Sequence, residues 1–431
     1  MMELEALYQV FLDSNGVVID TREDVAGKLF FAIRGERQDG NRFAEEALEK
    51  GAKASVVDNP TIKAEGCIHV ENVLQSLQNL AAHHRHRLSI PVIAITGSNG
   101  KTTTKELTAR VLRARYHAFA TPGNLNNYIG LPLSVLSIKE EDEVALLEFG
   151  ADHPGENELL ARISDPTHGL VTNIGLDHLE GFGDREGVFR GNKELIDHLE
   201  ARGGHAFFHA DDPDIQRMKP EKLSSNSYGT DASCDLQGSL LNAEPCLELE
   251  WRWKGNEARR FKTSLIGSYN FPNILAALCI GSGFGVPASS MESTIAAYEP
   301  DNNRSQVVHT ERNEVLLDAY NANPSSMEAA LESFLAMEGG PKRFILGDML
   351  EMGAYEEELH LRILHLLEDK GLTEGMLVGR AFQKAAADSG IPAYEDLKAA
   401  KKALKEAPYT ESQILVKGSR GLRLEELLEN L

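Results

Sequence analysis

A short run of small polar residues with one lysine is the part of this sequence whose chemistry is easiest to infer. The run reads Thr-Gly-Ser-Asn-Gly-Lys-Thr over residues 96–102 and lies between an apolar segment and a helical pattern. Backbone N–H groups in such a loop, together with the N-terminus of the helix that follows, bind phosphate oxygens. The lysine contacts the β- and γ-phosphates of a nucleotide, and the next hydroxyl binds Mg²⁺. We therefore predict a nucleotide site at Gly97, Ser98, Asn99, Gly100, Lys101, Thr102 and Thr103.

One departure from the usual loop leaves an alternative. Ile95 stands where the first glycine of the GxxxxGK[ST] pattern would be, so this loop is a shorter form. A strand–turn–helix junction without a ligand is the competing interpretation. The two glycines, the Lys-Thr pair and the apolar segment before them favour the nucleotide site.

Two polar residues stand at the ends of other apolar segments. Glu148 ends the segment 144–148, and His178 follows the segment 169–173. Ligands of an open parallel sheet bind beyond the carboxyl ends of its strands. A buried, ionised glutamate needs a positive partner such as the Mg²⁺ carried by ATP, although a helix cap or a solvated carboxylate is equally compatible with the sequence. A lone histidine is usually a hydrogen-bonded structural group, but the position of His178 after a strand favours a metal ligand.

Amide and charged side chains elsewhere are weaker signals. Asn126 and Asn127 offer donors and acceptors for phosphate oxygens or a peptide group, although turns favour asparagine anyway. Lys193 lies in a helical pattern beside carboxylates, where the residues alone indicate a simple ion pair. Arg304 and Asp318 have the types that bind phosphate and ribose hydroxyls, with a surface charge and a turn residue as the alternatives.

These groups need a scaffold that brings strand ends together, and the middle of the chain predicts one. Apolar segments and amphipathic helical patterns alternate there, which is typical of a parallel sheet covered by helices on both faces. The expected strands are 92–96, 144–148, 169–173 and 205–208, and the expected helices are 102–115, 156–163 and 189–200. Period-2 alternation over 246–253 and 259–265 predicts an antiparallel addition at the sheet edge.

The segments on either side predict two more α/β domains. In the first, the expected strands are 16–20, 28–33, 54–58 and 67–70, and the expected helices are 43–51 and 73–87. The basic end of the second helix, residues 83–88, is expected to be solvated. In the last, the expected strands are 314–320, 343–347, 375–378 and 413–417, and the expected helices are 325–337, 356–367, 381–387, 397–405 and 424–428. Asn323 followed by Pro324 is a good start for the first of these helices.

The predicted fold class is therefore α/β with three domains. Residues 1–86 form a small mixed α/β domain, residues 87–299 a central P-loop-type, doubly wound and mostly parallel sheet, and residues 300–431 a Rossmann-like domain. A chain of 431 residues is too long for one ordinary core, which agrees with several domains.

Composition excludes several classes of protein. A net charge of −22 argues against a nucleic-acid-binding surface, which needs a basic face. No apolar run approaches the length of a membrane span, and the acidic start lacks the features of a signal peptide. The four cysteines have no metal-ligand spacing, as expected in a reducing compartment. We expect a cytoplasmic protein.

The polar runs, in their order along the chain, resemble the Mur ligase family of ATP-dependent amide-bond-forming enzymes. The resemblance covers nearly the whole sequence. It is carried by residues 96–106, 124–133, 148–151, 172–178, 267–273, 318–327, 346–351 and 415–420, and in the first domain by 20–22, 29–36 and 39–40. Phe149 departs from the methionine that is usual after the glutamate, which is a conservative apolar change.

The resemblance implies a reaction and three substrates. The domains, in order, would bind UDP-N-acetylmuramoyl-tripeptide, ATP and the incoming dipeptide D-alanyl-D-alanine. The tripeptide carboxylate attacks the γ-phosphate of ATP to give an acyl phosphate, and the dipeptide amine then displaces phosphate. Domain closure is expected to keep water from this reactive intermediate. The resemblance also implies Mg²⁺, with two ions expected, and we expect a monomer.

The resemblance also implies roles for particular residues. Lys101 and Thr102 match phosphate and magnesium contacts, and Glu148 and His178 match magnesium ligands. Lys193 matches a lysine that the family converts to a carbamate, an anion that could bind a second Mg²⁺. The expected nucleotide contacts further include Asn270, Asn273, Arg304 and Asp318, and Lys417 and Arg420 are weaker candidates for dipeptide or phosphate contacts. The expected substrate contacts are Thr21, Arg22, Asn126, Asn127, Tyr320, Asn321 and Asn323.

Three other functions stay open at this point. A sister ligase adds the third peptide residue and carries an Asp-Asn-Pro-Arg-type signature in its last domain, whereas here Asp-Asn-Asn-Arg occurs at 301–304. A folylpolyglutamate synthetase-like ligase shares the loop but lacks a first domain of this kind. A nucleotide-binding regulatory module needs no second metal site, so the combination of Glu148, His178 and Lys193 argues against it.

Overall fold

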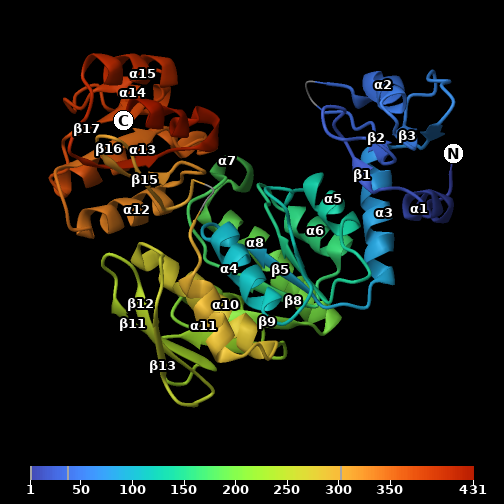
Figure 1. Ribbon diagram of the computed structural model, residues 1–431, viewed down its shortest axis with the longest axis horizontal. Coiled ribbons are helices and arrows are strands. Elements are labelled where there is room, and N and C mark those ends of the chain that lie inside the picture. The colour runs from blue at the N-terminus through green and yellow to red at the C-terminus, as the bar shows by residue number, and fades with distance from the viewer. Residues whose placement is uncertain (1, 36–37, 301–302) are drawn as a thin grey trace.

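The structure is a computed structural model that describes residues 2–35, 38–300 and 303–431. Three sheets form three successive bodies along the chain, and the middle body lies between the other two (Figure 1). The predicted runs 29–36 and 301–304 each extend into residues outside the described part.

The N-terminal domain contains a four-stranded parallel sheet in the order β1-β2-β3-β4. The strands are β1 (Val17–Val18), β2 (Leu29–Phe31), β3 (Ala54–Val57) and β4 (Cys67–His69), and the helices are α1 (Leu4–Leu12), α2 (Ala44–Glu49) and α3 (Val73–Arg87). Helix α3 has the predicted bounds, and its first turn is capped by the Asn72 side chain. Helix α1 was not predicted, although its buried residues Leu7, Tyr8 and Phe11 have helical spacing.

The predicted solvation of the end of α3 is wrong for two residues. His84 and Arg85 are buried. Nε2 of His84 lies 3.0 Å from the Ile138 carbonyl oxygen, and Nε of Arg85 donates to the Ser164 carbonyl oxygen at 2.8 Å. Both acceptors belong to the middle domain, so these side chains join the two domains instead of facing water.

The middle domain is built on a nine-stranded sheet in the order β13-β12-β11-β10-β9-β8-β5-β7-β6. Its strands are β5 (Val92–Thr96), β6 (Ala118–Ala120), β7 (Val144–Glu148), β8 (His168–Val171), β9 (His205–His209), β10 (Ser224–Gly229), β11 (Leu236–Asn242), β12 (Glu248–Trp253) and β13 (Arg259–Lys262). Strands β11 to β13 pair antiparallel, which confirms the predicted edge addition, although β6, β10 and β11 were missed. Strand β5 lies between β7 and β8, so the three strand ends are neighbours.

Helices cover both faces of this sheet (Figure 1). They are α4 (Lys101–Arg113), α5 (Gly130–Leu136), α6 (Glu156–Ser164), α7 (Leu179–Phe182), α8 (Arg185–Arg202), α9 (Pro213–Met218), α10 (Phe271–Gly283) and α11 (Ala288–Ala296). Within β5, Val92 and Ala94 join one apolar cluster, and Ile93 and Ile95 join the other. This alternation between two cores explains why the whole strand is apolar.

The C-terminal domain has a six-stranded sheet in the order β14-β15-β19-β16-β17-β18, in which only β14 pairs antiparallel. The strands are β14 (Gln306–His309), β15 (Glu314–Asp318), β16 (Lys342–Gly347), β17 (Gly375–Val378), β18 (Ala393–Tyr394) and β19 (Gln413–Lys417). The helices are α12 (Pro324–Ala336), α13 (Glu356–Asp369), α14 (Arg380–Ala385) and α15 (Leu397–Glu406). Asn323 caps α12 in a capping box, as predicted. The helix predicted over 424–428 is instead a 3₁₀ helix, Leu424–Asn430.

The predicted class, three α/β domains with mostly parallel sheets, is confirmed. The boundaries at residues 86 and 299 stay predictions. Among the helices of the described ranges, none is both long and apolar enough to cross a bilayer.

A half-buried histidine in the middle sheet makes stability depend on pH. The ring of His168 lies 5.0 Å from that of Phe284 and 5.5 Å from that of His205, measured between centroids. Burial, and next the neighbouring His205, lower the pKa of His168 to about 4. A histidine in the unfolded chain titrates near 6.5, so the unfolded state binds this proton first as the pH falls. The stability contributed by neutral His168 is therefore complete above pH 6.5 and is lost as the pH falls to about 4.

As the pH falls from 7 to 5, we expect proton binding linked to His168 to lower the free energy of unfolding by about 2 kcal/mol. Urea unfolding at the two pH values measures the change. The variant His168→Gln should lose less stability than the wild type over this interval, whereas His86→Gln, at a side chain that is 59% exposed, should lose as much as the wild type. An equal loss in wild type and His168→Gln would contradict this assignment.

Candidate active site

The predicted phosphate loop connects β5 to α4, and its glycines are required by its geometry. Gly97 and Gly100 have φ angles of +127° and +80°. A Cβ on Gly97 would lie 2.1 Å from Oγ1 of Thr172, and one on Gly100 would lie 2.5 Å from Oδ1 of Asn273. Larger residues therefore fit neither position, because the backbone there is left-handed and the space is filled. The Lys101 ammonium donates to the carbonyl oxygens of Gly97 and Ser98, so it folds over the loop.

Glu148, at the end of β7, lies beneath this loop and is 3% exposed. Its Oε1 accepts hydrogen bonds from Oγ1 of Thr102 at 3.1 Å and from Nδ2 of Asn126 at 2.8 Å. Its Oε2 is buried and has no hydrogen-bond partner among the residues that the structure describes. Buried polar atoms nearly always have a hydrogen-bond or metal partner. A buried carboxylate oxygen that lacks one and lies next to a threonine hydroxyl therefore fits a divalent cation.

His178 connects the middle domain to the C-terminal domain. It immediately precedes α7 and has a left-handed φ of +47°, and its Nδ1 is paired with the carboxylate of Glu351, which follows β16. Burial by itself would lower the pKa of His178, but the hydrogen bond that its ring donates to Glu351 and the charge of Asp177 outweigh burial and raise the pKa above its usual value. The hydrogen bond from His178 in turn lowers the pKa of Glu351. A ring held by a carboxylate in this way has a fixed orientation, as metal-binding histidines do.

A cavity of about 670 Å³ lies between the two domains and collects most of the predicted residues. The strand ends and the loop of the middle domain form one wall, and the C-terminal domain forms the other. The predicted residues that line it are Ser98, Asn99, Gly100, Lys101, Thr102, Thr103, Asn126, Asn127, Glu148, His178, Asn270, Asn273, Arg304, Asp318, Tyr320, Asn321, Lys417 and Arg420.

Cationic groups gather on the C-terminal wall around one aromatic ring. The guanidinium groups of Arg304 and Arg420 lie 3.9 and 5.1 Å from the centroid of the Tyr320 ring. Nε of Arg304 is buried and has no hydrogen-bond partner within the described ranges. Nζ of Lys417 donates to Oδ2 of Asp318 at 2.6 Å. A wall of this charge is suited to phosphate groups, and Arg304 has a free donor for one.

Some predicted residues lie outside the cavity lining. Gly97 belongs to the loop, and its carbonyl oxygen accepts a hydrogen bond from Lys101. Nδ2 of Asn323 donates to Oδ1 of Asn99 at 2.9 Å, so Asn323 joins the C-terminal domain to the loop. Lys193 lies on α8, is 34% exposed and pairs with Asp197 one turn later. Thr21 and Arg22 are in the N-terminal domain, where they contact Glu46 and Asp20. The functional roles predicted for these residues stay predictions.

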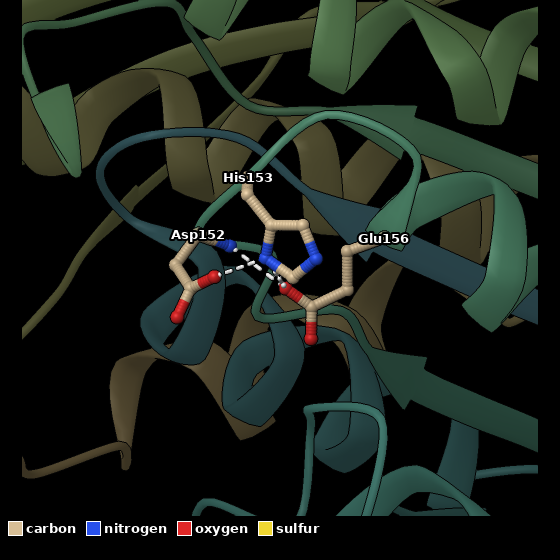
Figure 2. A group of neighbouring side chains, drawn as sticks. All are labelled: Asp152, His153 and Glu156. Atoms are coloured by element: carbon tan, nitrogen blue, oxygen red, sulfur yellow. Dashed lines mark hydrogen bonds and ion pairs between the residues drawn. The ribbon is translucent and has the colours of Figure 1, made fainter. Parts of the chain in front are cut away.

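A group of titratable residues at the rim of this cavity was not predicted from the sequence. Asp152 lines the cavity, and the side chains of His153 and Glu156 lie next to Asp152 (Figure 2). Nδ1 of His153 lies 2.5 Å from Oδ1 of Asp152, and Oε2 of Glu156 accepts from the Asp152 backbone N–H at 2.9 Å. The hydrogen bond to Asp152 raises the pKa of His153, and burial raises that of Glu156. The signal was available, because three titratable residues follow the end of β7 within eight positions.

Glu351 was also missed as a site residue, although it stands just after the strand β16. It lines the cavity and holds His178. A polar residue after a parallel strand is the same signal that identified Glu148.

Comparisons with known proteins agree with the three domains. The family model described as "Mur ligase family, catalytic domain" matches residues 13–96, "Mur ligase middle domain" matches 95–281, and "Mur ligase, glutamate ligase domain" matches 303–420. The chain is 34% identical over 430 residues to the UDP-N-acetylmuramoyl-tripeptide--D-alanyl-D-alanine ligase of Bacillus subtilis, covering 97% of this chain and 93% of that protein.

Solved structures give the same result. A crystal structure of MurF from Acinetobacter baumannii is 27% identical and superposes with a TM-score of 0.87, covering 99% of this chain and 97% of that one. MurF ligase from Thermotoga maritima in complex with ADP is 28% identical, with a TM-score of 0.85 and coverage of 100% and 98%.

Proposed function

This chain belongs to the Mur ligase family of ATP-dependent amide-bond-forming ligases, and we propose that it joins D-alanyl-D-alanine to UDP-N-acetylmuramoyl-tripeptide in peptidoglycan precursor synthesis. The observation that carries this proposal is the cavity between the middle and C-terminal domains. There a phosphate loop, an orphaned buried carboxylate oxygen and an arginine-rich wall face one another. That combination is suited to a nucleotide whose terminal phosphate must meet a second substrate.

The reaction that we propose has two displacements. A carboxylate oxygen of the tripeptide attacks the γ-phosphorus of ATP, the bond to the β-phosphate oxygen breaks, and ADP leaves. The dipeptide amine then attacks the carbonyl carbon of the acyl phosphate, loses a proton, and inorganic phosphate leaves with the C–O bond electrons. Lys101 is suited to screen the negative charge that otherwise keeps carboxylate and phosphate apart.

Residues of the middle domain fit a divalent cation. We propose that Thr102, Glu148 and His178 hold Mg²⁺, and that Lys193, once converted to a carbamate, holds a second ion. Mg²⁺ bound there supplies positive charge to the phosphate oxygens. The chain itself contributes the buried oxygen of Glu148 and the fixed ring of His178.

The remaining predicted residues divide between the two other substrates and the nucleotide. We propose that Thr21 and Arg22 contact the UDP-sugar, that Asn126 and Asn127 contact its peptide, and that the C-terminal wall contacts the dipeptide. The residues of the C-terminal domain proposed for the dipeptide are Tyr320 and Asn321 of that wall and the neighbouring Asn323. For the nucleotide we propose Asn270 and Asn273 on the adenine side, and Arg304 and Asp318 on phosphate and ribose. We also propose a cytoplasmic monomer, because ATP is plentiful in that compartment and one chain supplies both cavity walls.

Phosphate release tests the proposed function. We expect release from Mg·ATP only when UDP-N-acetylmuramoyl-tripeptide and D-alanyl-D-alanine are both present, with the UDP-linked pentapeptide as product. Mass spectrometry identifies that product. The matched control offers UDP-N-acetylmuramoyl-dipeptide with a diamino acid, which would be coupled by the sister ligase. Coupling of that pair would overturn the proposed substrate choice. Phosphate release at the same rate with and without these substrates would overturn the ligase function.

A further inference from the structure

A second lysine lies behind the phosphate loop and has no place in the reaction above. Lys105 is on α4, one turn after Lys101, and is 1% exposed. A buried ammonium is costly unless it is paired and hydrogen-bonded. Its Nζ donates to the carbonyl oxygen of Thr121 at 2.9 Å and lies 3.1 Å from Oε1 of Glu106.

The third neighbour of Lys105 is the orphaned oxygen of Glu148. Nζ of Lys105 lies 3.8 Å from Oε2 of Glu148, which is within range of an ion pair but beyond a hydrogen bond. The ammonium, which Glu148 shares with Glu106, thus offsets the charge of the buried carboxylate while Oε2 stays free of a hydrogen bond. The other oxygen, Oε1, is fixed by Thr102 and Asn126.

We propose that Lys105 is the resident counterion of Glu148 in the cation-free site and leaves Oε2 of that carboxylate free for a divalent cation. This inference rests on the proposed function only in naming the cation. Lys105 balances the charge of Glu148 while the site lacks the cation, and its attachment to Thr121 and Glu106 keeps the ammonium from closing onto Oε2. An ammonium at hydrogen-bond distance would occupy the oxygen that the cation needs.

A purely structural role makes a different prediction. If Lys105 served only to hold α4 to the Thr121 carbonyl oxygen, its removal would lower the free energy of unfolding by the same amount whatever residue stands at position 148. If Lys105 is the counterion of Glu148, its removal leaves an uncompensated buried charge, and neutralising that charge restores stability.

The test is a double-mutant cycle on thermal unfolding of the full chain without nucleotide or metal. Lys105→Met keeps most of the side-chain volume and removes the charge. We expect it to lower the unfolding midpoint by about 5–10 °C, and we expect Lys105→Met/Glu148→Gln to recover at least half of that loss. Additive effects of the two substitutions would overturn the proposal. If Lys105→Met does not fold, recovery of folding in the double variant supports the proposal, and failure of both overturns it.

A matched control and a second readout complete the experiment. Lys342 is another lysine held by two carbonyl oxygens and an amide oxygen, and Lys342→Met should show no coupling to Glu148→Gln. We further expect Mg·ADP to raise the midpoint of Lys105→Met by several degrees more than that of the wild type, since the cation then meets an unbalanced carboxylate. An equal or smaller rise would overturn the counterion role.

The two parts of the experiment separate the proposal from the proposed function. The cycle uses neither substrate nor nucleotide, so its result stands whichever peptide the enzyme extends. Failure of ADP to bind the wild type would count against the proposed function and leave the Lys105–Glu148 coupling as measured.

Discussion

Replacing Lys101 by methionine is expected to lower kcat/KM for amide-bond formation by roughly 10³-fold, with little change in the unfolding midpoint. In the structure the ammonium lies over the loop and faces the cavity, where it contacts only backbone carbonyl oxygens among the described residues. Its removal therefore breaks no ion pair, so the folded state loses little. The transition state loses a positive charge next to the phosphate group that is being transferred, and such contacts are worth several kcal/mol in a site that excludes water.

Steady-state phosphate release measures this effect, and calorimetry with ADP separates binding from chemistry. The matched control is Lys139→Met, at a side chain that is 72% exposed and outside the cavity lining. It should keep the wild-type rate. A Lys101→Met enzyme within about threefold of the wild type would contradict the assignment of the loop as the phosphate site.

Replacing Lys193 by alanine is the second large expected effect, with a loss of activity of roughly 10²- to 10³-fold. The lysine is now paired with Asp197 on the same helix. Conversion to a carbamate would reverse its charge, so the side chain would leave Asp197 and become a ligand for a cation. The alanine variant lacks that ligand but has room for a small carboxylate to take its place. Added short carboxylic acids such as acetate should therefore restore part of the activity.

Two comparisons make this prediction decisive. Asp197→Asn breaks the observed ion pair and keeps the lysine, so it should stay within about threefold of the wild type because exposed pairs contribute little. Mass spectrometry of the intact chain under carbon dioxide should detect the added carbamate on the wild type and not on Lys193→Ala. Full activity of Lys193→Ala would show that this lysine is only the ion-pair residue that its neighbours suggest.

The predicted residues that the structure brings into one cavity were identified from local chemistry and from strand order. The loop needs glycines at positions 97 and 100, and Glu148 ends an apolar strand, so both could be recognised without knowing their neighbours. Parallel strands bring their carboxyl ends to one edge, which is why Glu148 and His178 were expected to share a site. The structure confirms that they line the same cavity.

The features that were missed depend on contacts far apart in the sequence. His84 and Arg85 belong to a polar run, and only the acceptors at Ile138 and Ser164 show why they are buried. Glu351 holds His178 from another domain, and no periodicity links the two.

The short strands β6, β14 and β18 have two to four residues each, which is too few for a period-2 pattern to be recognised.

The cavity has one wall from each of two domains, and polar contacts that include Asn99 with Asn323 and His178 with Glu351 join those walls. A molecule that touches both walls therefore gains part of its affinity from the angle at which the domains meet. The two effects are reciprocal. If binding of such a molecule favours one angle between the domains, then any change that favours that angle raises the affinity for the molecule by the same factor. Affinity for a nucleotide that touches both walls would thus be a property of the pair of domains and could not be assigned to the loop alone.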